Sequence, residues 1–175
     1  WSDFRGFPRS CCLFQQRMVY AGTTYQPQSV WGSVIGDYEN FAYGTLDDDA
    51  FMHEIGSDER LFVMWMTAHN NSLLIGTSSA EYVLQGSNAG DDPVTPSNVQ
   101  IKRQCSIGSA RMRPIHAGGA VLHVQRDAEK LYELTYSLST YGYDDNDITQ
   151  FAEHIMSGGV KAMAFQRQPD PIVWV

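Results

Sequence analysis

The stretch that decides the fold is Val63-Met64-Trp65-Met66-Thr67-Ala68-His69-Asn70-Asn71-Ser72-Leu73-Leu74-Ile75-Gly76. It is a short apolar segment, then two asparagines that tolerate the positive φ of a tight turn, then a more hydrophobic segment. The continuous apolar run in the second segment is typical of a strand with both faces buried. The stretch therefore predicts an antiparallel hairpin whose second strand lies in the core.

A similar unit returns about every fifty residues. The other copies are Cys11–Gly22, Ile115–Val124 and Ala162–Val175, and the four second strands centre on Val19, Leu74, Leu122 and Val173. A repeat of this length with several strands per unit is typical of radial β-architectures, the propellers. We therefore expect the strands around Val19, Leu74 and Leu122 to lie in separate antiparallel sheets.

The predicted class is all-β, with propeller-like blades of short antiparallel strands in one region, 1–175. The expected blade-like units cover about 10–45, 50–86, 99–138 and 160–175. One short helix is expected over 147–156, because Asp147 can cap it, Phe151 and Ile155 share a face, and Gly158 follows its end. Because the chain starts at Trp1 and stops inside a strand pattern, we expect a fragment of a larger propeller.

Two segments are expected to be loops, Asn88–Pro96 and the acidic, tyrosine-rich Tyr141–Asp147. The segment Val99–Ser106 alternates and predicts a half-buried strand. The side chains expected in the core are Tyr20, Trp31, Leu74, Ile75, Val121 and Val124.

The composition limits the partners. Twenty acidic against twelve basic residues give a net charge of −8, which argues against tight binding to a phosphate backbone. The three cysteines give no disulfide framework, and neighbouring Cys11 and Cys12 point to opposite faces of a strand. Buried thiols of a protein made in a reducing cytoplasm are expected. No apolar run approaches the roughly 20 residues of a membrane span.

Motifs that carry chemistry are absent from the sequence. It contains no G-x-S-x-G elbow, phosphate loop or dinucleotide fingerprint. The five histidines share no short metal-binding spacing, although a zinc site assembled from distant strands stays open. His123 alternates with apolar residues and is expected to be a satisfied core or edge histidine. We therefore expect no catalytic, cofactor-binding or metal residues.

Three weaker patterns have both a chemical and a plain interpretation. Carboxylates for glycoside cleavage could come from Asp47, Asp48, Asp49, Glu54 or Glu81, but spacing does not choose among them. The acidic run 144–147 suggests calcium, although it lacks the glycine and distal glutamate of a calcium loop, and helix capping explains it equally. The basic residues Lys102, Arg103, Arg111 and Arg113 are a nucleic-acid patch or, more simply, a solvated face.

Several runs of sequence together resemble one protein family. They are Phe7-Pro8-Arg9, Phe14-Gln15-Gln16-Arg17-Met18-Val19-Tyr20-Ala21-Gly22-Thr23, Gln26-Pro27-Gln28-Ser29-Val30-Trp31-Gly32-Ser33 and Gly36-Asp37-Tyr38-Glu39-Asn40-Phe41, followed by shorter runs as far as Gln168–Trp174. In this order they resemble the tail tubular, or nozzle, proteins of podovirus-like phages and related prophages, also called stabilisation proteins.

The resemblance implies a propeller-like body that forms a homo-oligomeric ring below the portal, conducts the genome and anchors the adsorption apparatus. It implies a virion location after synthesis in the bacterial host, contacts with other tail and connector proteins, and no catalytic residues. Duplex DNA would pass without specific binding, along a neutral or acidic surface. The acidic segments 47–49, 91–92 and 144–145 are expected to face a channel or a partner ring.

Two other functions stay open. A propeller that binds or cleaves host-surface glycans would use aromatic side chains for stacking, and the candidates are Trp31, Trp65, Tyr141 and Tyr143. An intracellular propeller that docks other proteins is the second alternative.

Overall fold

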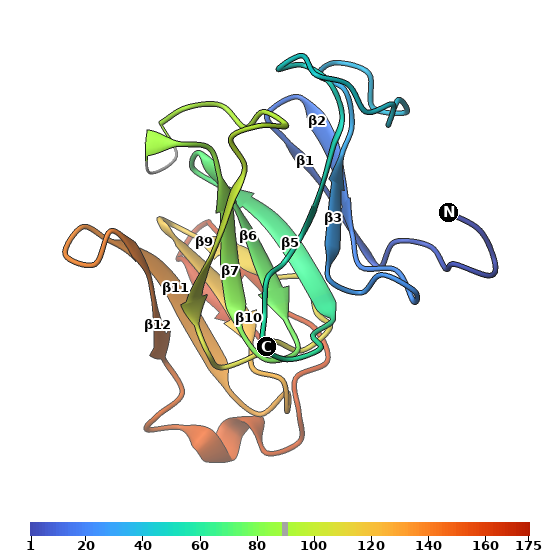
Figure 1. The fold of residues 1–175 in the computed structure, drawn as a ribbon. Helices are drawn as coiled ribbons and strands as arrows, with labels where there is room; N and C mark the ends of the chain where they lie inside the picture. Colours follow the sequence, from blue (N-terminus) through green and yellow to red (C-terminus); the bar gives the residue numbers. More distant parts are fainter. Residues whose placement is uncertain (89–90) are drawn as a thin grey trace.

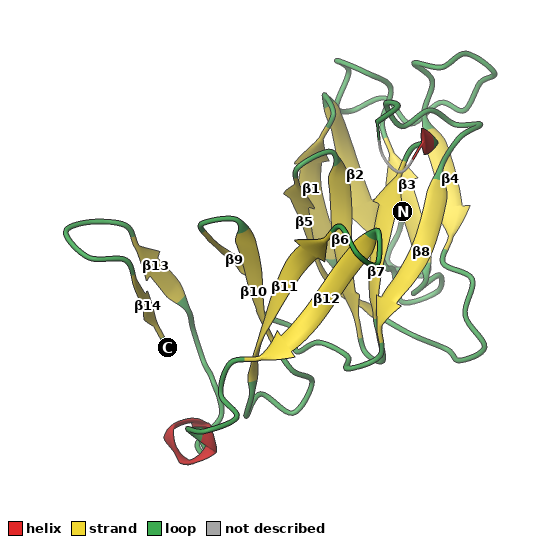
Figure 2. Ribbon diagram, turned by 90° about the vertical axis from the view of Figure 1, so that its left-hand side faces the viewer, coloured by secondary structure: helices red, strands yellow, loops and turns green. Residues whose placement is uncertain are grey.

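The computed structural model describes residues 1–88 and 91–175, whose regular secondary structure is almost entirely antiparallel β-strand (Figures 1 and 2). Residues 89 and 90, in the loop expected over 88–96, lie outside this description. Strands that follow one another in the chain pair with one another, so each sheet is a simple meander. The all-β class predicted from the sequence is confirmed.

The first two sheets have four strands each. Their strands are β1 (Ser10–Phe14), β2 (Arg17–Ala21), β3 (Ser29–Gly32) and β4 (Phe51–Glu54), then β5 (Val63–His69), β6 (Ser72–Thr77), β7 (Glu81–Gln85) and β8 (Gln100–Cys105). The half-buried strand expected over 99–106 is thus the last strand of the second sheet. Gln15 and Gln16 form the β1–β2 turn and Asn70 lies in the β5–β6 turn, all with positive φ. For Asn70 this is the conformation that the turn chemistry predicts.

The third sheet has four strands and the fourth has two. They comprise β9 (Ile115–Ala117), β10 (Ala120–Val124), β11 (Leu131–Ser137) and β12 (Gly142–Asp147), then β13 (Ala164–Gln166) and β14 (Ile172–Trp174). Val19, Leu74 and Leu122 lie in β2, β6 and β10, in three different sheets, and all three are buried. The expected separation is confirmed. The sheets, however, end later than the expected units, because β4, β8 and β12 each complete the sheet that precedes them.

The sheets stack face to face, with β5–β8 between β1–β4 and β9–β12. Along β6, Leu73 and Ile75 pack into the apolar cluster shared with the first sheet, whereas Leu74 packs toward the third sheet. We call these contacts the first interface (β1–β4 with β5–β8) and the second interface (β5–β8 with β9–β12). Because both faces of β6 are covered, its apolar residues run continuously instead of alternating.

The stacking also brings corresponding strands of neighbouring sheets together. The first strand β1 contacts β5, β9 contacts β13, and the last strands β8 and β12 contact each other. Figure 2 shows the resulting series, from β13–β14 at the left through β9–β10 to β3–β4 at the right. Beyond β10, Leu122 and Val124 pack with Val160 and Val173 in a smaller cluster under the fourth sheet.

The helix expected over 147–156 is wrong in extent and type. Asp147 ends β12, where it pairs with Tyr132, and its carboxylate accepts bonds from the amide and the hydroxyl of Thr149. Only one 3-10 turn, Glu153–Met156, follows. Phe151 is 96% exposed, so the apolar spacing that predicted a helix face has nothing to pack against.

The loop expected over Tyr141–Asp147 is also wrong, because Gly142–Asp147 is strand β12. Its polar residues pair with β11 through the backbone, a contact that composition does not encode. The turn lies one step earlier, at Tyr141, whose φ is +49°.

The expected core is correct except at two places. Trp31, Leu74, Ile75, Val121 and Val124 are buried, but Tyr20 is half-buried, under the ring of Trp1 at a centroid distance of 5.0 Å. The expectation of buried thiols is also wrong, because Cys11 is exposed and Cys12 and Cys105 are only half-buried. Cys11 lies on edge strand β1 and lines a groove beside β5. In the described residues, no helix is long and apolar enough to cross a membrane.

Candidate functional site

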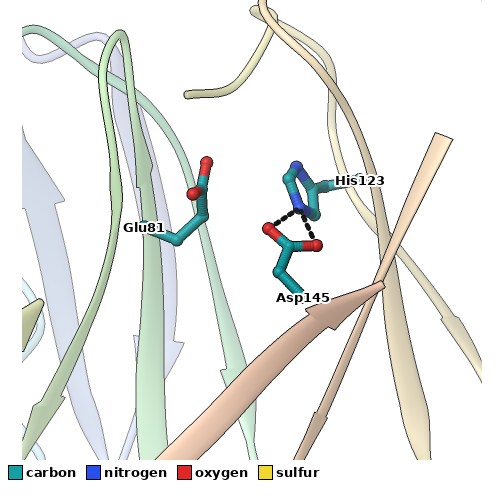
Figure 3. A group of neighbouring side chains, drawn as sticks. All are labelled: Glu81, His123 and Asp145. Carbon is teal, nitrogen blue, oxygen red and sulfur yellow. Dashed lines mark hydrogen bonds and ion pairs between the residues drawn. The ribbon is translucent and has the colours of Figure 1, made fainter. Parts of the chain in front are cut away.

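Glu81, His123 and Asp145 meet at the second interface, from strands of two different sheets (Figure 3). Glu81 begins β7 and shares the face of Val83, while His123 in β10 shares the face of Val121. Asp145 in β12 is two residues beyond the buried Tyr143 and points the same way. Period-two alternation in three strands thus directs three ionisable side chains into one interface.

A chain of hydrogen bonds connects the three side chains through Ser109. The hydroxyl of Ser109 donates to Oε1 of Glu81 at 2.9 Å and lies 3.2 Å from Nδ1 of His123. Nε2 of His123 lies 3.1 and 3.2 Å from the two carboxylate oxygens of Asp145. The amide of Ile107 donates to the other oxygen of Glu81 at 3.4 Å. We call these four residues (Glu81, Ser109, His123 and Asp145) the buried polar cluster.

The cluster is closed to solvent. The side chains of His123 and Asp145 are 0% and 2% exposed, and Glu81 is 2% exposed. The His123 ring stacks on Tyr132 and lies 5.6 Å from Trp65. A substrate therefore has no open approach to the cluster, and its arrangement suits cross-linking of two sheets or ion binding better than catalysis.

Burial governs the electrostatics of the cluster. Desolvation raises the pKa of the Glu81 carboxyl, and the neighbouring His123 and Ser109 act against this rise. Burial together with the charges of Asp145 and Glu81 raises the pKa of the Cys105 thiol to about 12. Cys105, which pairs with Glu81 across β7 and β8, therefore stays a neutral thiol.

The sequence predicted only one member of this cluster in its correct setting. His123 is the satisfied core histidine that its alternation in β10 indicates. Glu81 is one of five carboxylates that the sequence offers for glycoside cleavage without distinguishing among them. The loop expected over Tyr141–Asp147 includes Asp145, which the structure places in strand β12. The usable signal was a single polar residue at an inward position of an otherwise apolar strand, as at His123 within Ala120–Val124. No sequence spacing links such positions when they come from different sheets.

The other histidines lie elsewhere. His69 and His116 stack on each other with ring centroids 5.6 Å apart, and Nε2 of His116 is 2.8 Å from the hydroxyl of Thr67. His53 contacts the carbonyl of Pro96, and His154 lies in the exposed 3-10 turn.

The acidic segment 47–49 is held by Arg17, which is 1% exposed. The guanidinium donates to the carbonyls of Asp47 and Asp49 at 2.7 and 2.6 Å and to that of Ser33 at 2.6 Å. The buried charge thus fixes the backbone of the loop, and the side chains of Asp47 and Asp48 remain at the surface.

The acidic run 144–147 does not converge on one point. In β12, Asp145 points into the second interface and Asp144 points out to solvent. Asp147 bonds Lys130 and Thr149 instead. The strand geometry therefore excludes a calcium loop at this place. The expectation that Asp145 faces a channel or a partner ring is wrong, because its side chain is buried in the second interface.

The basic residues fall on two elements. Lys102 and Arg103 are exposed on β8, while Arg111 and Arg113 lie in the connection from β8 to β9. The latter two line a groove of about 700 Å³ beside β1 and β5, together with Arg9 and methionines. No carboxylate is among the described residues that line this groove. We call it the arginine groove.

Aromatic side chains offered for sugar stacking are mostly in the core. Trp31, Trp65 and Tyr143 are 3–5% exposed, and only Tyr141 is at the surface. Of the candidate carboxylates, Glu81 is buried, and Glu54 lies in a separate groove with Asp58 and Glu59. The structure thus does not assemble the four aromatics into a sugar platform.

Neither protein-family models nor curated proteins give a significant match to this chain.

Proposed function

We propose that this chain is a non-enzymatic structural module of a phage tail, located in the virion. In this proposal it forms part of a propeller-like body, and copies assemble into a ring or nozzle below the portal. Other tail and connector proteins bind the ring, which conducts DNA and anchors the adsorption apparatus.

The observation that carries the proposal is the role of the residues behind the family resemblance. Arg17, the arginine of Gln15-Gln16-Arg17, donates its guanidinium hydrogen bonds to backbone carbonyls of its own chain. The hydroxyl oxygen of Ser33 accepts a hydrogen bond from the amide of Met18. Gly32 leaves room for the ring of Phe51, which a Cβ at this position would clash with. These requirements are architectural, as expected for a motif of a structural protein.

The arrangement of the sheets supports the propeller component of the proposal. Successive four-stranded meanders stack face to face. The first strands β1 and β5 of the first two sheets lie side by side, as do the last strands β8 and β12 of the second and third. Blades of a propeller have this relation around a central axis. The sheets of the described residues do not form a closed propeller, and further blades would be needed to complete one. The closed propeller is therefore part of the proposal.

Charge supports the assembly component. The Arg17-held loop exposes Asp47 and Asp48, whereas the arginine groove carries Arg9, Arg111 and Arg113 without a carboxylate. Two different surfaces of opposite charge on one chain suit a head-to-tail contact between copies. Such a heterologous contact gives a ring when the rotation from one copy to the next closes around an axis.

The experiment measures assembly by light scattering and negative-stain electron microscopy. We expect concentration-dependent rings of the wild-type chain. The double charge reversals Arg111→Glu/Arg113→Glu and Asp47→Lys/Asp48→Lys should each abolish them, and mixing the two variants should restore them. Lys102→Glu/Arg103→Glu on β8 is the control, with the same charge change on another surface. A wild-type chain that stays monomeric at every concentration would contradict the proposal.

DNA binding provides a second test. The proposal expects no measurable duplex binding near physiological salt, because the chain is acidic and a conduit should not retain its cargo. Tight, salt-sensitive binding that Arg111→Glu/Arg113→Glu removes would instead assign the arginine groove to nucleic acid.

The two other functions have less support. A glycan-binding or glycan-cleaving propeller lacks exposed stacking aromatics at Trp31, Trp65 and Tyr143, and a glycan array would test it directly. An intracellular docking propeller would be favoured if the neighbouring genes encode no portal or scaffold protein.

A further inference from the structure

We propose that Glu81, His123 and Asp145 bind one divalent metal ion of the zinc type, which cross-links β5–β8 to β9–β12. This inference does not depend on the proposed function, because it concerns only the buried polar cluster.

The spacing of the potential ligand atoms suits a shared ion. One ligand atom from each residue lies within 4.8 Å of those from the other two. Two ligands bound to the same zinc ion at 2.0–2.2 Å in a tetrahedron stand roughly 3.3 Å apart. His123 Nε2 and Asp145 Oδ2 are already 3.1 Å apart, so only the Glu81 carboxylate needs to move closer. Figure 3 shows the Glu81 carboxylate at the left, facing the hydrogen-bonded His123 and Asp145 at the right.

The hydrogen-bond inventory has a place for a cation. When the single hydroxyl proton of Ser109 is donated to an ionised Glu81, the Ser109 oxygen accepts a bond from Nδ1–H of His123. The lone pair of Nε2 then faces the carboxylate of Asp145, which has only acceptor atoms. A proton can fill this place and convert His123 to an imidazolium. A metal ion can fill the same place and leaves the bond between Ser109 and His123 intact.

The charge balance favours a divalent ion. With a neutral imidazole and both carboxylates ionised, Glu81 and Asp145 place two negative charges in a region closed to water, which is costly unless they are compensated. Among the described residues, neither carboxylate forms a salt bridge with lysine or arginine. A dication neutralises both charges, whereas one proton neutralises only one.

The donor set and its surroundings define the type of ion. One imidazole nitrogen with two carboxylate oxygens suits zinc, while calcium and magnesium prefer oxygen ligands alone. The bond from Nδ1 of His123 to Ser109 fixes the tautomer that exposes Nε2, as outer partners of metal-bound histidines do. Because all three side chains are buried, the ion would hold the sheets together and would not meet a substrate.

The test begins with protein unfolded in urea with a chelator, because the buried site fills during folding. The protein is refolded with Zn²⁺, Ca²⁺ or Mg²⁺. One portion is desalted and assayed by inductively coupled plasma mass spectrometry, and a second portion is unfolded thermally in the presence of the free metal ion. We expect one zinc per chain and a melting temperature about 5–10 °C higher with zinc at a hundredfold excess over Kd. Calcium and magnesium should give neither effect.

Variants locate the ion. Glu81→Gln, His123→Gln and Asp145→Asn should each lose the bound zinc. Asp144→Asn, the outward neighbour on β12, and His116→Gln should keep it. If the ligand variants do not fold, Co²⁺ bound to the wild-type chain gives the answer, since its absorption should lack a thiolate charge-transfer band and Cys105→Ser should leave the spectrum unchanged.

Three results would overturn the inference. The first is wild-type protein that refolds without bound zinc and with a melting temperature indifferent to zinc. The second is zinc retained by His123→Gln in folded protein. The third is a thiolate band that disappears in Cys105→Ser, because the ion would then lie at a different donor set.

Discussion

The two faces of the sheet β5–β8 are closed in different ways. At the first interface the buried cluster is apolar, with Leu73, Ile75 and Leu84 at 0% exposure. At the second interface a smaller apolar cluster around Leu74 and Val121 continues into the buried polar cluster. Apolar side chains can repack when two sheets shift, whereas buried ionisable groups must keep their hydrogen-bond partners. The first interface therefore supplies stability, and the second adds a geometric constraint on how its two sheets meet.

Adjacent leucines of β6 give the largest and most direct test of this difference. Leu73→Ala and Leu74→Ala should each reduce the free energy of unfolding by about 2–5 kcal/mol, as large-to-small changes at fully buried positions do. We expect the greater loss for Leu73→Ala, because its cavity lies in the larger apolar cluster. Urea denaturation measures both losses.

Leu13→Ala is the control for these variants, since Leu13 is 58% exposed on β1 and should change stability by less than about 0.5 kcal/mol. A larger loss for Leu74→Ala than for Leu73→Ala would reverse our ranking of the interfaces.

Gly76 tests how tightly the second interface is packed. A Cβ at this position would lie 2.1 Å from the indole ring of Trp65, so Gly76→Ala forces the ring to move. We expect a loss of about 1–3 kcal/mol, typical of an overpacked core, seen as a lower melting temperature.

Gly119→Ala is the matched control, because a Cβ there meets nothing within 4 Å. If both alanine variants unfold at the same temperature, the indole of Trp65 has room to move and the interface is looser than we describe.

The smallest expected effect is a pH dependence carried by the rim of the second interface. Burial, and then His116, lower the pKa of His69; burial, and then Arg113, lower the pKa of His116. The unfolded chain therefore binds more protons than the folded chain as pH falls below about 6.5, and stability decreases in that window. Thermal unfolding between pH 7.5 and 5.5, with chelator, should show a weaker decrease for His116→Gln.

The informative quantity in this experiment is the difference between the two slopes. Glu81 has a raised pKa and contributes stability with the opposite sign, present at low pH and lost as pH rises. The contribution of Glu81 is the same in the wild-type chain and in His116→Gln, so it cancels when the two slopes are subtracted. Identical slopes would mean that His116 is as free to take up a proton in the folded chain as in the unfolded one.

Local patterns predicted much of the fold because they depend on neighbours in the chain. The turns at Asn70 and Gly118 follow from residues that accept positive φ, and the buried strands follow from apolar runs. The helix at 147–156 failed because its apolar spacing had no surface to cover, as the exposure of Phe151 shows. Strand β12 was missed because a polar strand is made by pairing, not by its own composition.

The sequence by itself determined that this protein is built from repeated antiparallel hairpins, because turn chemistry and apolar periodicity act over a few residues. The tertiary structure decided which strand completes which sheet and which face of β6 meets which neighbour. It alone brought Glu81, His123 and Asp145 together, from positions about forty and twenty residues apart in the chain. Such a contact depends on the stacking of two complete sheets, and no short-range pattern in the chain records that stacking.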